Sequence, residues 1–231
     1  MRRSTVMKIY LEENSMDAQG DATACQTATR SKLVFSLLLG FALPILSGST
    51  AGAGSLTAVV PPSSISYEDG GASAGLAVAI RMQELYGPEL FPNTAIVIRE
   101  IHFRPDSTYG IGPFQGTISN IRFRLSTTTR TVATMSQTFG DNMGQDATDV
   151  FVGPWSLSTA ATGPAAGPKA FDIRLPLQVP FRYDPHLGAL LLEYRNYSGL
   201  PQRLHTDAAT TPSGSVRMIY SDGQPDAQIA S

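Results

Sequence analysis

The most regular pattern in the chain is an alternation of apolar and polar residues from Phe171 to Tyr183. Apolar side chains occupy every odd position, and the even positions carry Asp172, Arg174, Pro176, Gln178, Pro180 and Arg182. A period of two places one face of a β-strand on a core and the other in water. Proline cannot donate a hydrogen bond to a β-ladder, so Pro176 and Pro180 predict a strand at a sheet edge or one interrupted by a bulge.

Similar alternation at residues 101–103 and 121–125 predicts further half-exposed strands. Apolar runs separated by turn residues predict additional strands at 94–99, 130–138, 149–158, 188–195 and 215–221. A helical turn is expected only within 76–91, where Gly87-Pro88 would cut it short. Several strands at hairpin spacing, without a long helical pattern, predict an all-β fold: an antiparallel β-sandwich or a jelly roll.

The most apolar stretch, Leu33–Leu46, has a different character. Arg30 and Lys32 precede it and Ala51-Gly52-Ala53 follows it. The stretch is shorter than the roughly 20 residues that a membrane-spanning helix needs. A basic flank, a short apolar core and an A-x-A-like site are typical of a secretory signal peptide, here cleaved after Ala53. A buried core helix or a retained anchor is the alternative.

This interpretation divides the chain into two parts. Residues 1–53 form an N-terminal extension with the signal peptide, and residues 54–231 form one β-sandwich domain. The mature protein is then secreted, extracellular or held at the cell surface, and has no stable membrane span. The chain's single cysteine, Cys25, lies in the part that is removed. The mature domain therefore has no disulfide, zinc-thiolate site or thiol nucleophile.

Charge and composition limit the classes of partner that are expected to bind the chain. The 231 residues carry 17 Lys+Arg and 19 Asp+Glu, which gives a formal net charge of -2. Without a basic run, the chain lacks the clustered positive charge that displaces counterions from phosphate, so nucleic acid is not expected as a partner. With 42% apolar residues, the chain has enough side chains to bury a core.

An oxygen-rich segment at residues 140–149 is the best candidate for a metal site. Its carboxylates, Asp141, Asp146 and Asp149, are the hard oxygen ligands that Ca²⁺ prefers. The spacing is not that of an EF-hand, and an ordinary loop rich in Asp and Asn is the alternative. No cofactor other than this Ca²⁺ is expected.

Other candidate groups would need the fold to bring them together. The three histidines show no metal-ligand spacing, and no G-x-S-x-G motif occurs. Carboxylates for glycoside hydrolysis could come from Glu84, Glu89, Glu100 and Glu193. A platform for sugar rings could come from Tyr109, Trp155, Tyr194 and Tyr197, although single aromatic residues on strands are more often core.

Several stretches between residues 64 and 220 carry a resemblance to a known family. They include SQTFGDNMGQDATDVFVGPWSLS and GPKAFDIRLPLQVPFRYDPHLGALLLEYRNYSG. In this order they resemble exported bacterial proteins of the PEP-CTERM class, whose β-rich ectodomains have no established activity. Members usually end in a Val-Pro-Glu-Pro-like signal, an apolar helix and a basic tail. The residues up to Ser231 show no such tail, so sorting by that route is not predicted.

Together these observations predict a secreted, non-enzymatic β-sandwich protein of unknown ligand, associated with the cell surface or extracellular matrix. Its expected partner is an extracellular polysaccharide or a cell-surface component. Two alternatives stay open. One is a carbohydrate-binding module with exposed aromatic residues, and the other is a secreted hydrolase whose site assembles only in three dimensions.

Overall fold

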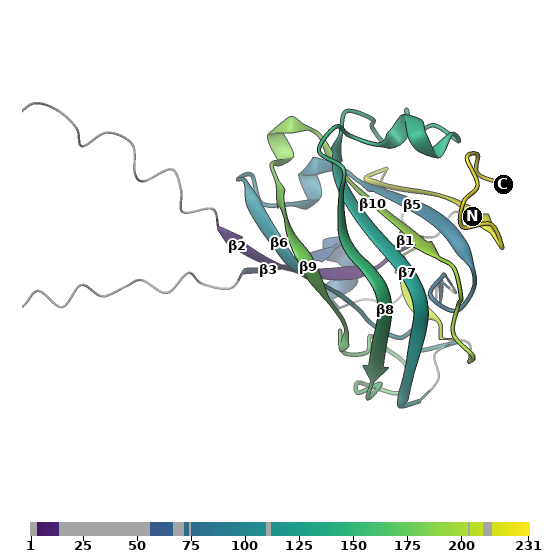
Figure 1. Cartoon of the computed structure of the whole chain (residues 1–231). Coiled ribbons are helices and arrows are strands. Elements are labelled where there is room, and N and C mark those ends of the chain that lie inside the picture. Colours follow the sequence, from purple (N-terminus) through teal and green to yellow (C-terminus); the bar gives the residue numbers. More distant parts are fainter. Residues whose placement is uncertain are drawn as a thin grey trace, which may run out of the picture.

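The computed structural model describes residues 4–13, 56–66, 72–73, 75–109, 112–202, 204–209 and 214–231 (Figure 1). Its strands are β1 (Ser4–Thr5), β2 (Met7–Glu13), β3 (Leu56–Val60), β4 (Ala72–Ser73), β5 (Ile80–Tyr86), β6 (Ile96–Phe103), β7 (Phe114–Thr128), β8 (Thr148–Thr159), β9 (Ile173–Tyr183), β10 (Ala189–Asn196), β11 (Thr206–Ala209) and β12 (Val216–Asp222). Short 3₁₀ turns are η2 (Pro62–Ile65), η3 (Pro88–Leu90), η4 (Phe139–Asn142) and η5 (Pro185–Leu187). The predicted signal peptide and its cleavage site lie outside the described residues.

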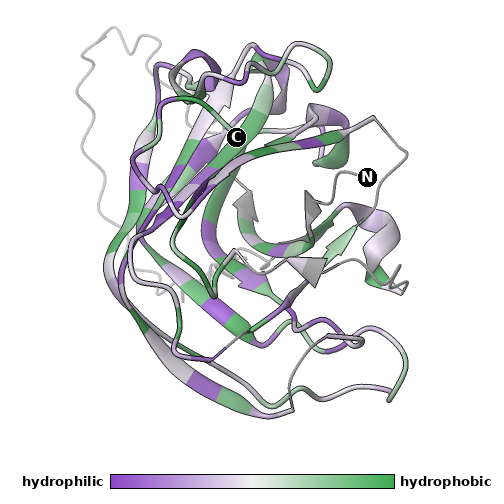
Figure 2. Ribbon diagram, turned by 90° about the vertical axis from the view of Figure 1, so that its right-hand side faces the viewer, coloured by the Kyte–Doolittle hydropathy of each residue, from purple (hydrophilic) through white to green (hydrophobic). Residues whose placement is uncertain are grey.

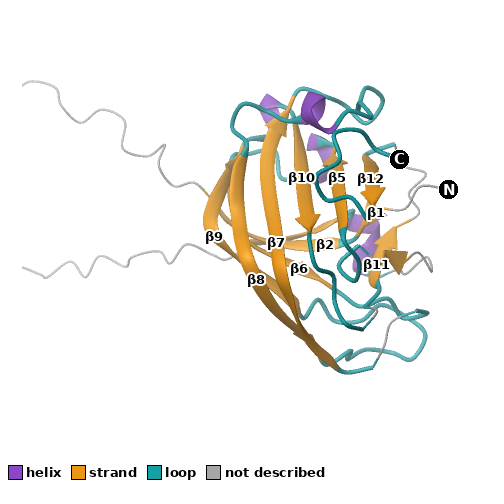
Figure 3. Cartoon of the chain, turned by 45° about the vertical axis from the view of Figure 1, so that its right-hand side comes forward, coloured by secondary structure: helices purple, strands orange, loops and turns teal. Residues whose placement is uncertain are grey.

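Two antiparallel sheets pack face to face, which confirms the predicted all-β sandwich. One sheet has the order β12-β5-β10-β7-β8, and the other has the order β3-β2-β6-β9. A small third sheet, β1-β11-β4, lies beside them. Figure 3 shows β8, β7, β10 and β5 of the first sheet as a curved wall, with β9 of the second sheet beside β8 and with β2 and β6 behind. No helix in the described part of the chain is long and apolar enough to cross a bilayer.

The core lies between the two sheets because each strand turns alternate apolar residues inward. Figure 2 shows this alternation as hydrophobic and hydrophilic bands along the strands. Aromatic rings fill the centre: Phe123 lies 5.5 Å from Trp155 in an edge-on arrangement and 5.4 Å from Tyr194, measured between ring centroids. Phe103, from the opposite sheet, approaches Trp155 at 6.1 Å. The contact between Phe103 and Trp155 joins the two sheets through large side chains.

The prediction for the strand from Phe171 to Tyr183 is confirmed in its main point. This strand, β9, is the edge of the four-stranded sheet, and its pairing with β6 shifts register between Ile98 and Glu100. The residues between its two prolines leave the ladder. There the side-chain amide of Gln178 hydrogen-bonds both the N–H and the carbonyl of Val152 on β8, at 3.0 and 3.1 Å.

The same irregularity corrects one detail of the predicted core face. Ile173, Leu175, Phe181 and Tyr183 are buried as expected. Val179 is 45% exposed, and Leu177 is only partly buried. A strict alternation cannot continue through a bulge, because extra residues in one strand rotate the following side chains out of phase.

Two other expectations are corrected by the packing. In the segment 76–91, where a helical turn was expected, only the short 3₁₀ turn η3 near the end is helical, and the middle forms β5, whose seven residues are all buried. Its second face is covered by a small cluster in which Met135 and Phe139 pack with Leu85, Leu191 and Ile219. Residues 130–138, predicted as a strand, form turns instead. This loop covers the outer face of the five-stranded sheet. Its apolar residues are therefore spaced to contact the cluster beneath them, and they do not alternate as in a strand.

The N-terminal strands are part of the sandwich. In the four-stranded sheet, β2 lies between β3 and β6, and Met7, Ile9 and Leu11 reach the core. This pairing crosses the division predicted between residues 53 and 54. The physical reason is visible in the sequence, where Met7, Ile9 and Leu11 alternate with Lys8 and Tyr10 as a half-buried strand requires.

Candidate functional site

A network of charged and amide side chains covers the outer face of the five-stranded sheet. Register places Glu193 of β10 opposite Gln83 of β5 on one side and Arg124 of β7 on the other. Glu193 Oε2 accepts hydrogen bonds from Arg81 Nε and Nη2 at 3.0 and 2.8 Å, and from Gln83 Nε2 at 2.8 Å. Its Oε1 accepts from Arg195 Nε at 3.1 Å. Glu193 and Arg81 are almost fully buried, and burial lowers the pKa of Arg81.

This network fixes the segment around η4 on the sheet. Gln83 Nε2 donates to the carbonyl of Phe139 at 3.0 Å, and Asn142 Nδ2 donates to Gln83 Oε1 at 3.0 Å. The guanidinium of Arg81 lies 4.4 Å from the centroid of the Phe139 ring. Arg81 Nη1 also donates to the carbonyl of Ala227 at 2.6 Å, which holds the C-terminal segment. These buried groups hold the covering loops on the sheet.

The three predicted calcium ligands lie in or just after the loop that contains η4, but their carboxylates share no hydrogen-bond donor. Their carboxylates accept hydrogen bonds from three different neighbours: Asp141 Oδ2 from Ser136 Oγ at 2.9 Å, Asp146 Oδ1 from Thr127 N at 2.8 Å, and Asp149 Oδ1 from Arg124 Nε at 2.7 Å. Within the described ranges, no group of three or more His, Cys, Asp or Glu residues could hold a metal ion.

Melting curves can test whether Asp141, Asp146 and Asp149 bind calcium, as the sequence predicts. An ion bound only by the folded state would raise the melting temperature, and the rise would grow with the ratio of the free ion concentration to its dissociation constant. Because each carboxylate already has its own protein partner, we expect the curves with chelator and with millimolar Ca²⁺ to coincide. A rise that is lost in the Asp146→Asn variant would instead establish a calcium site on this loop.

The four glutamates considered for hydrolysis do not face one another. Glu84 on β5 and Glu193 on β10 are offset by one position in the register, so they project from opposite faces of the sheet. Glu84 is in the core, where burial raises the pKa of its carboxyl. Glu100 lies on the outside of the other sheet and accepts from His102 Nε2 at 2.7 Å and from Arg174 Nη2 at 3.2 Å. The hydrogen bond with His102 lowers the pKa of Glu100.

The histidines lie apart from one another as well. His102 is buried on β6 beside Glu100, whereas His186 lies in η5, where its Nδ1 is 2.8 Å from Asp184 Oδ1. The ring of His205 lies 6.0 Å from that of Tyr109.

The four aromatic residues do not form one platform. Trp155 and Tyr194 belong to the core, and Trp155 Nε1 donates to the carbonyl of Arg174 at 3.0 Å. Tyr197 is half-buried, with its hydroxyl donating to Asp226 Oδ1 at 3.1 Å. Tyr109 is exposed. The sandwich needs Trp155 and Tyr194 to fill its centre, so they are not available to a sugar ring.

The structure contains a pocket of about 440 Å³ that the sequence did not predict. It lies where β5 and β7 end and β10 begins. Its floor is apolar, formed by Leu85 and Ala189, and its walls are η3 and the loop after β7. The lining residues are Leu85, Gly87, Pro88, Glu89, Thr128, Thr129, Arg130, Thr131, Val132, Ala133, Gly188, Ala189 and Gly214. Threonines, one carboxylate and one guanidinium therefore surround a small apolar base.

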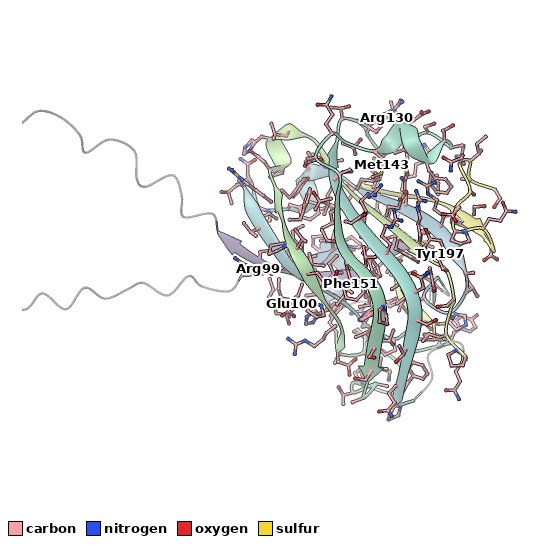
Figure 4. All side chains as sticks on the ribbon, in the orientation of Figure 1. Arg99, Glu100, Arg130, Met143, Phe151 and Tyr197 are labelled. Carbon is pink, nitrogen blue, oxygen red and sulfur yellow. The ribbon has the colours of Figure 1, made fainter. Side chains whose placement is uncertain are left out.

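Local contacts fix the shape of this pocket. Arg130 Nε donates to the carbonyl of Asp141 at 3.2 Å, which holds the guanidinium at the rim. Figure 4 shows Arg130 above Met143 at one end of the molecule. Gly188 has a φ of 145°, and a Cβ there would lie 2.3 Å from the carbonyl oxygen of Thr128. Only glycine fits both the conformation and the space. The turn around Gly188 was visible in the sequence, but its approach to Thr128 depends on the pairing of β7 with β10.

Comparison of the chain with protein-family models, with curated proteins and with solved structures finds no match.

Proposed function

We propose that the protein is a non-enzymatic, exported β-sandwich that binds an extracellular polysaccharide through the pocket at the end of the five-stranded sheet. The observation that carries this proposal is the pocket's lining. Pockets of 300–1,000 Å³ with a few convergent polar groups are typical ligand sites. The Thr129 and Thr131 side chains are exposed beside Glu89 and Arg130, so hydroxyls and both signs of charge face the same space.

The chemistry of the rim favours a particular class of sugar. A planar guanidinium binds carboxylates in bidentate geometry, and a carboxylate accepts hydrogen bonds from sugar hydroxyls. Arg130 would thus bind the carboxylate of a uronic acid unit, while Glu89 and the threonines bind hydroxyls. The resemblance to exported proteins of the PEP-CTERM class supports an extracellular location, where such polymers occur. Because β2 is part of the sandwich, this support does not depend on cleavage after Ala53.

Titration with a uronic-acid oligosaccharide, with a neutral glucan oligosaccharide as comparison, tests this function. We expect the uronic-acid ligand to bind more tightly. Arg130→Ala should weaken its binding at least tenfold, because the rim loses a charge-assisted hydrogen-bond donor worth about 1.5–3 kcal/mol. Glu89→Gln should have a smaller effect on the same ligand. Isothermal titration calorimetry measures all four affinities: those of the native protein for the two oligosaccharides and those of the two variants for the uronic-acid ligand.

A matched control separates pocket binding from general charge attraction. Arg182 is exposed on β9 and does not line the pocket. Arg182→Ala removes the same charge as Arg130→Ala, and we expect it to leave the affinity unchanged. Equal losses in the two variants, or no binding of either oligosaccharide, would contradict the proposed function. Melting curves of each variant verify that the fold is intact.

A further inference from the structure

The N-terminal segment Ser4–Glu13 occupies a position that is central in space, although it comes first in the chain. Strand β2 pairs with β6 on one side and with β3 on the other, both antiparallel (Figure 1). Strand β3 has β2 as its only strand neighbour in the described sheet order. Removing β2 would therefore separate β3 from the sheet and expose the edge of β6.

Side chains of this segment complete the core. Met7, Ile9 and Leu11 are each at most 2% exposed and belong to the main apolar cluster. Lys8 and Tyr10 point outward, where the ammonium of Lys8 lies 5.0 Å from the centroid of the Tyr10 ring. The segment is thus recognised by backbone hydrogen bonds on both edges and by three apolar side chains on one face. This is the pattern by which sheets bind an added strand.

The buried carboxylate of Glu84 contacts the segment near its N-terminal end. Glu84 Oε1 accepts hydrogen bonds from the N–H of Thr5 at 2.9 Å and from its hydroxyl at 2.7 Å. Tyr86 donates to the other carboxylate oxygen. The N–H of Val6 donates to the carbonyl of Asp207 at 3.0 Å. Without Thr5, a fully buried acid would lose two of its donors, which is costly in an apolar interior.

The stretch of chain that joins this segment to β3 is longer than the pairing of β2 with β3 requires. Leu11 and Leu56 are paired neighbours in adjacent antiparallel strands, a relation that a hairpin of two to five residues can provide. Here 42 residues, 14–55, separate Glu13 from Leu56. A link of this length gives the segment only a modest effective concentration, which falls further as length increases.

We propose that Ser4–Glu13 is a donor strand that needs no covalent continuity with β3, and that its position in the sheet accepts the same segment from a second copy of the chain. Exchange of an identical element between copies creates no new contact type and is a low-cost route to association. Strand exchange would join copies of the domain through contacts that each copy already makes within itself.

The test starts from the full-length, folded chain with a specific protease site inserted within residues 14–55. After cleavage, we expect the two pieces to elute together in size-exclusion chromatography. A fluorescein-labelled synthetic peptide of residues 4–13 should then exchange with the bound segment and reach about half occupancy at equimolar concentration, because the two segments have the same sequence. Separation of the pieces with an unchanged near-UV circular dichroism spectrum would overturn the proposal, as would retention without any exchange.

Two variant peptides test whether binding depends on the side chains that the structure places in the core. Ile9→Asp places a charge in the core, and we expect that peptide to compete at least tenfold more weakly than the native one. The Lys8→Gln peptide changes the outward-facing residue next to Ile9. We expect its affinity to lie within about twofold of that of the native peptide. Equal competition by both peptides would show that binding is nonspecific and would refute the donor-strand assignment. Failure of sugar binding at the pocket would leave this result unaffected.

Discussion

Replacing Glu193 with alanine should lower the free energy of unfolding by about 3–5 kcal/mol, because it leaves the buried guanidinium of Arg81 without its charge partner. Arg81 is 3% exposed and donates two hydrogen bonds to Glu193. Gln83 and Arg195 lose an acceptor at the same time. Urea denaturation, followed by tryptophan fluorescence from Trp155, measures the change.

Two comparisons isolate the role of the buried charge. Arg124→Ala breaks the half-exposed ion pair with Asp149 and should cost about 0–1 kcal/mol, as surface pairs do. The double variant Arg81→Met/Glu193→Leu removes both charges and should recover part of the loss, since apolar replacement of a buried pair is often neutral. If Glu193→Ala cost no more than Arg124→Ala, the network would not anchor the loops that cover the sheet.

Replacing Ile173 with alanine should cost about 2–5 kcal/mol, through lost burial and the cavity that remains. Ile173 is fully buried at the start of β9, in the core between the sheets. Leu177→Ala should cost less than Ile173→Ala, because Leu177 is only partly buried beside the bulge. Thermal and urea unfolding of the two variants measure the difference.

The opposite face of β9 provides the control. Arg182 is exposed, so Arg182→Ala should change stability by no more than about 0.5 kcal/mol. Gln178→Ala should cost more than Arg182→Ala, because its amide satisfies both backbone groups of Val152. Equal losses for Ile173→Ala and Arg182→Ala would mean that both faces of β9 are buried, which would exclude its place in an outer layer of a two-layer sandwich.

The fold class was predictable from the sequence because it depends on local alternation. The period of two in β9, and its two prolines, predicted an edge strand with an irregularity. The alternation failed where two faces are buried, as in β5, since no polar face then marks the strand. It also failed at residues 130–138, where apolar side chains face a covering cluster instead of a second sheet. Met7, Ile9 and Leu11 alternate as a half-buried strand requires, but the basic flank and the apolar stretch Leu33–Leu46 after them predicted a signal peptide instead.

The candidate site was much less predictable. Asp141, Asp146 and Asp149 are close in sequence, but the strand that begins at Thr148 directs Asp149 toward Arg124. The pocket residues come from η3, the loop after β7 and the start of β10, so no local spacing reports their proximity. Glu84 and Glu193 illustrate the same limit: whether two carboxylates share a face depends on strand register, which pairing determines.

The contacts between β8 and β9 have a consequence for the protein at high concentration. Each of these strands is the outermost of its sheet, and exposed edges are templates for pairing with other chains. The amide of Gln178 satisfies the Val152 backbone in the middle of β8, and Trp155 donates to the carbonyl of Arg174 on β9. One side of the sandwich is therefore closed against intermolecular strand addition. At high protein concentration, this closure would limit aggregation to the other edges of the sheets, where β3 and β12 are outermost among the described strands.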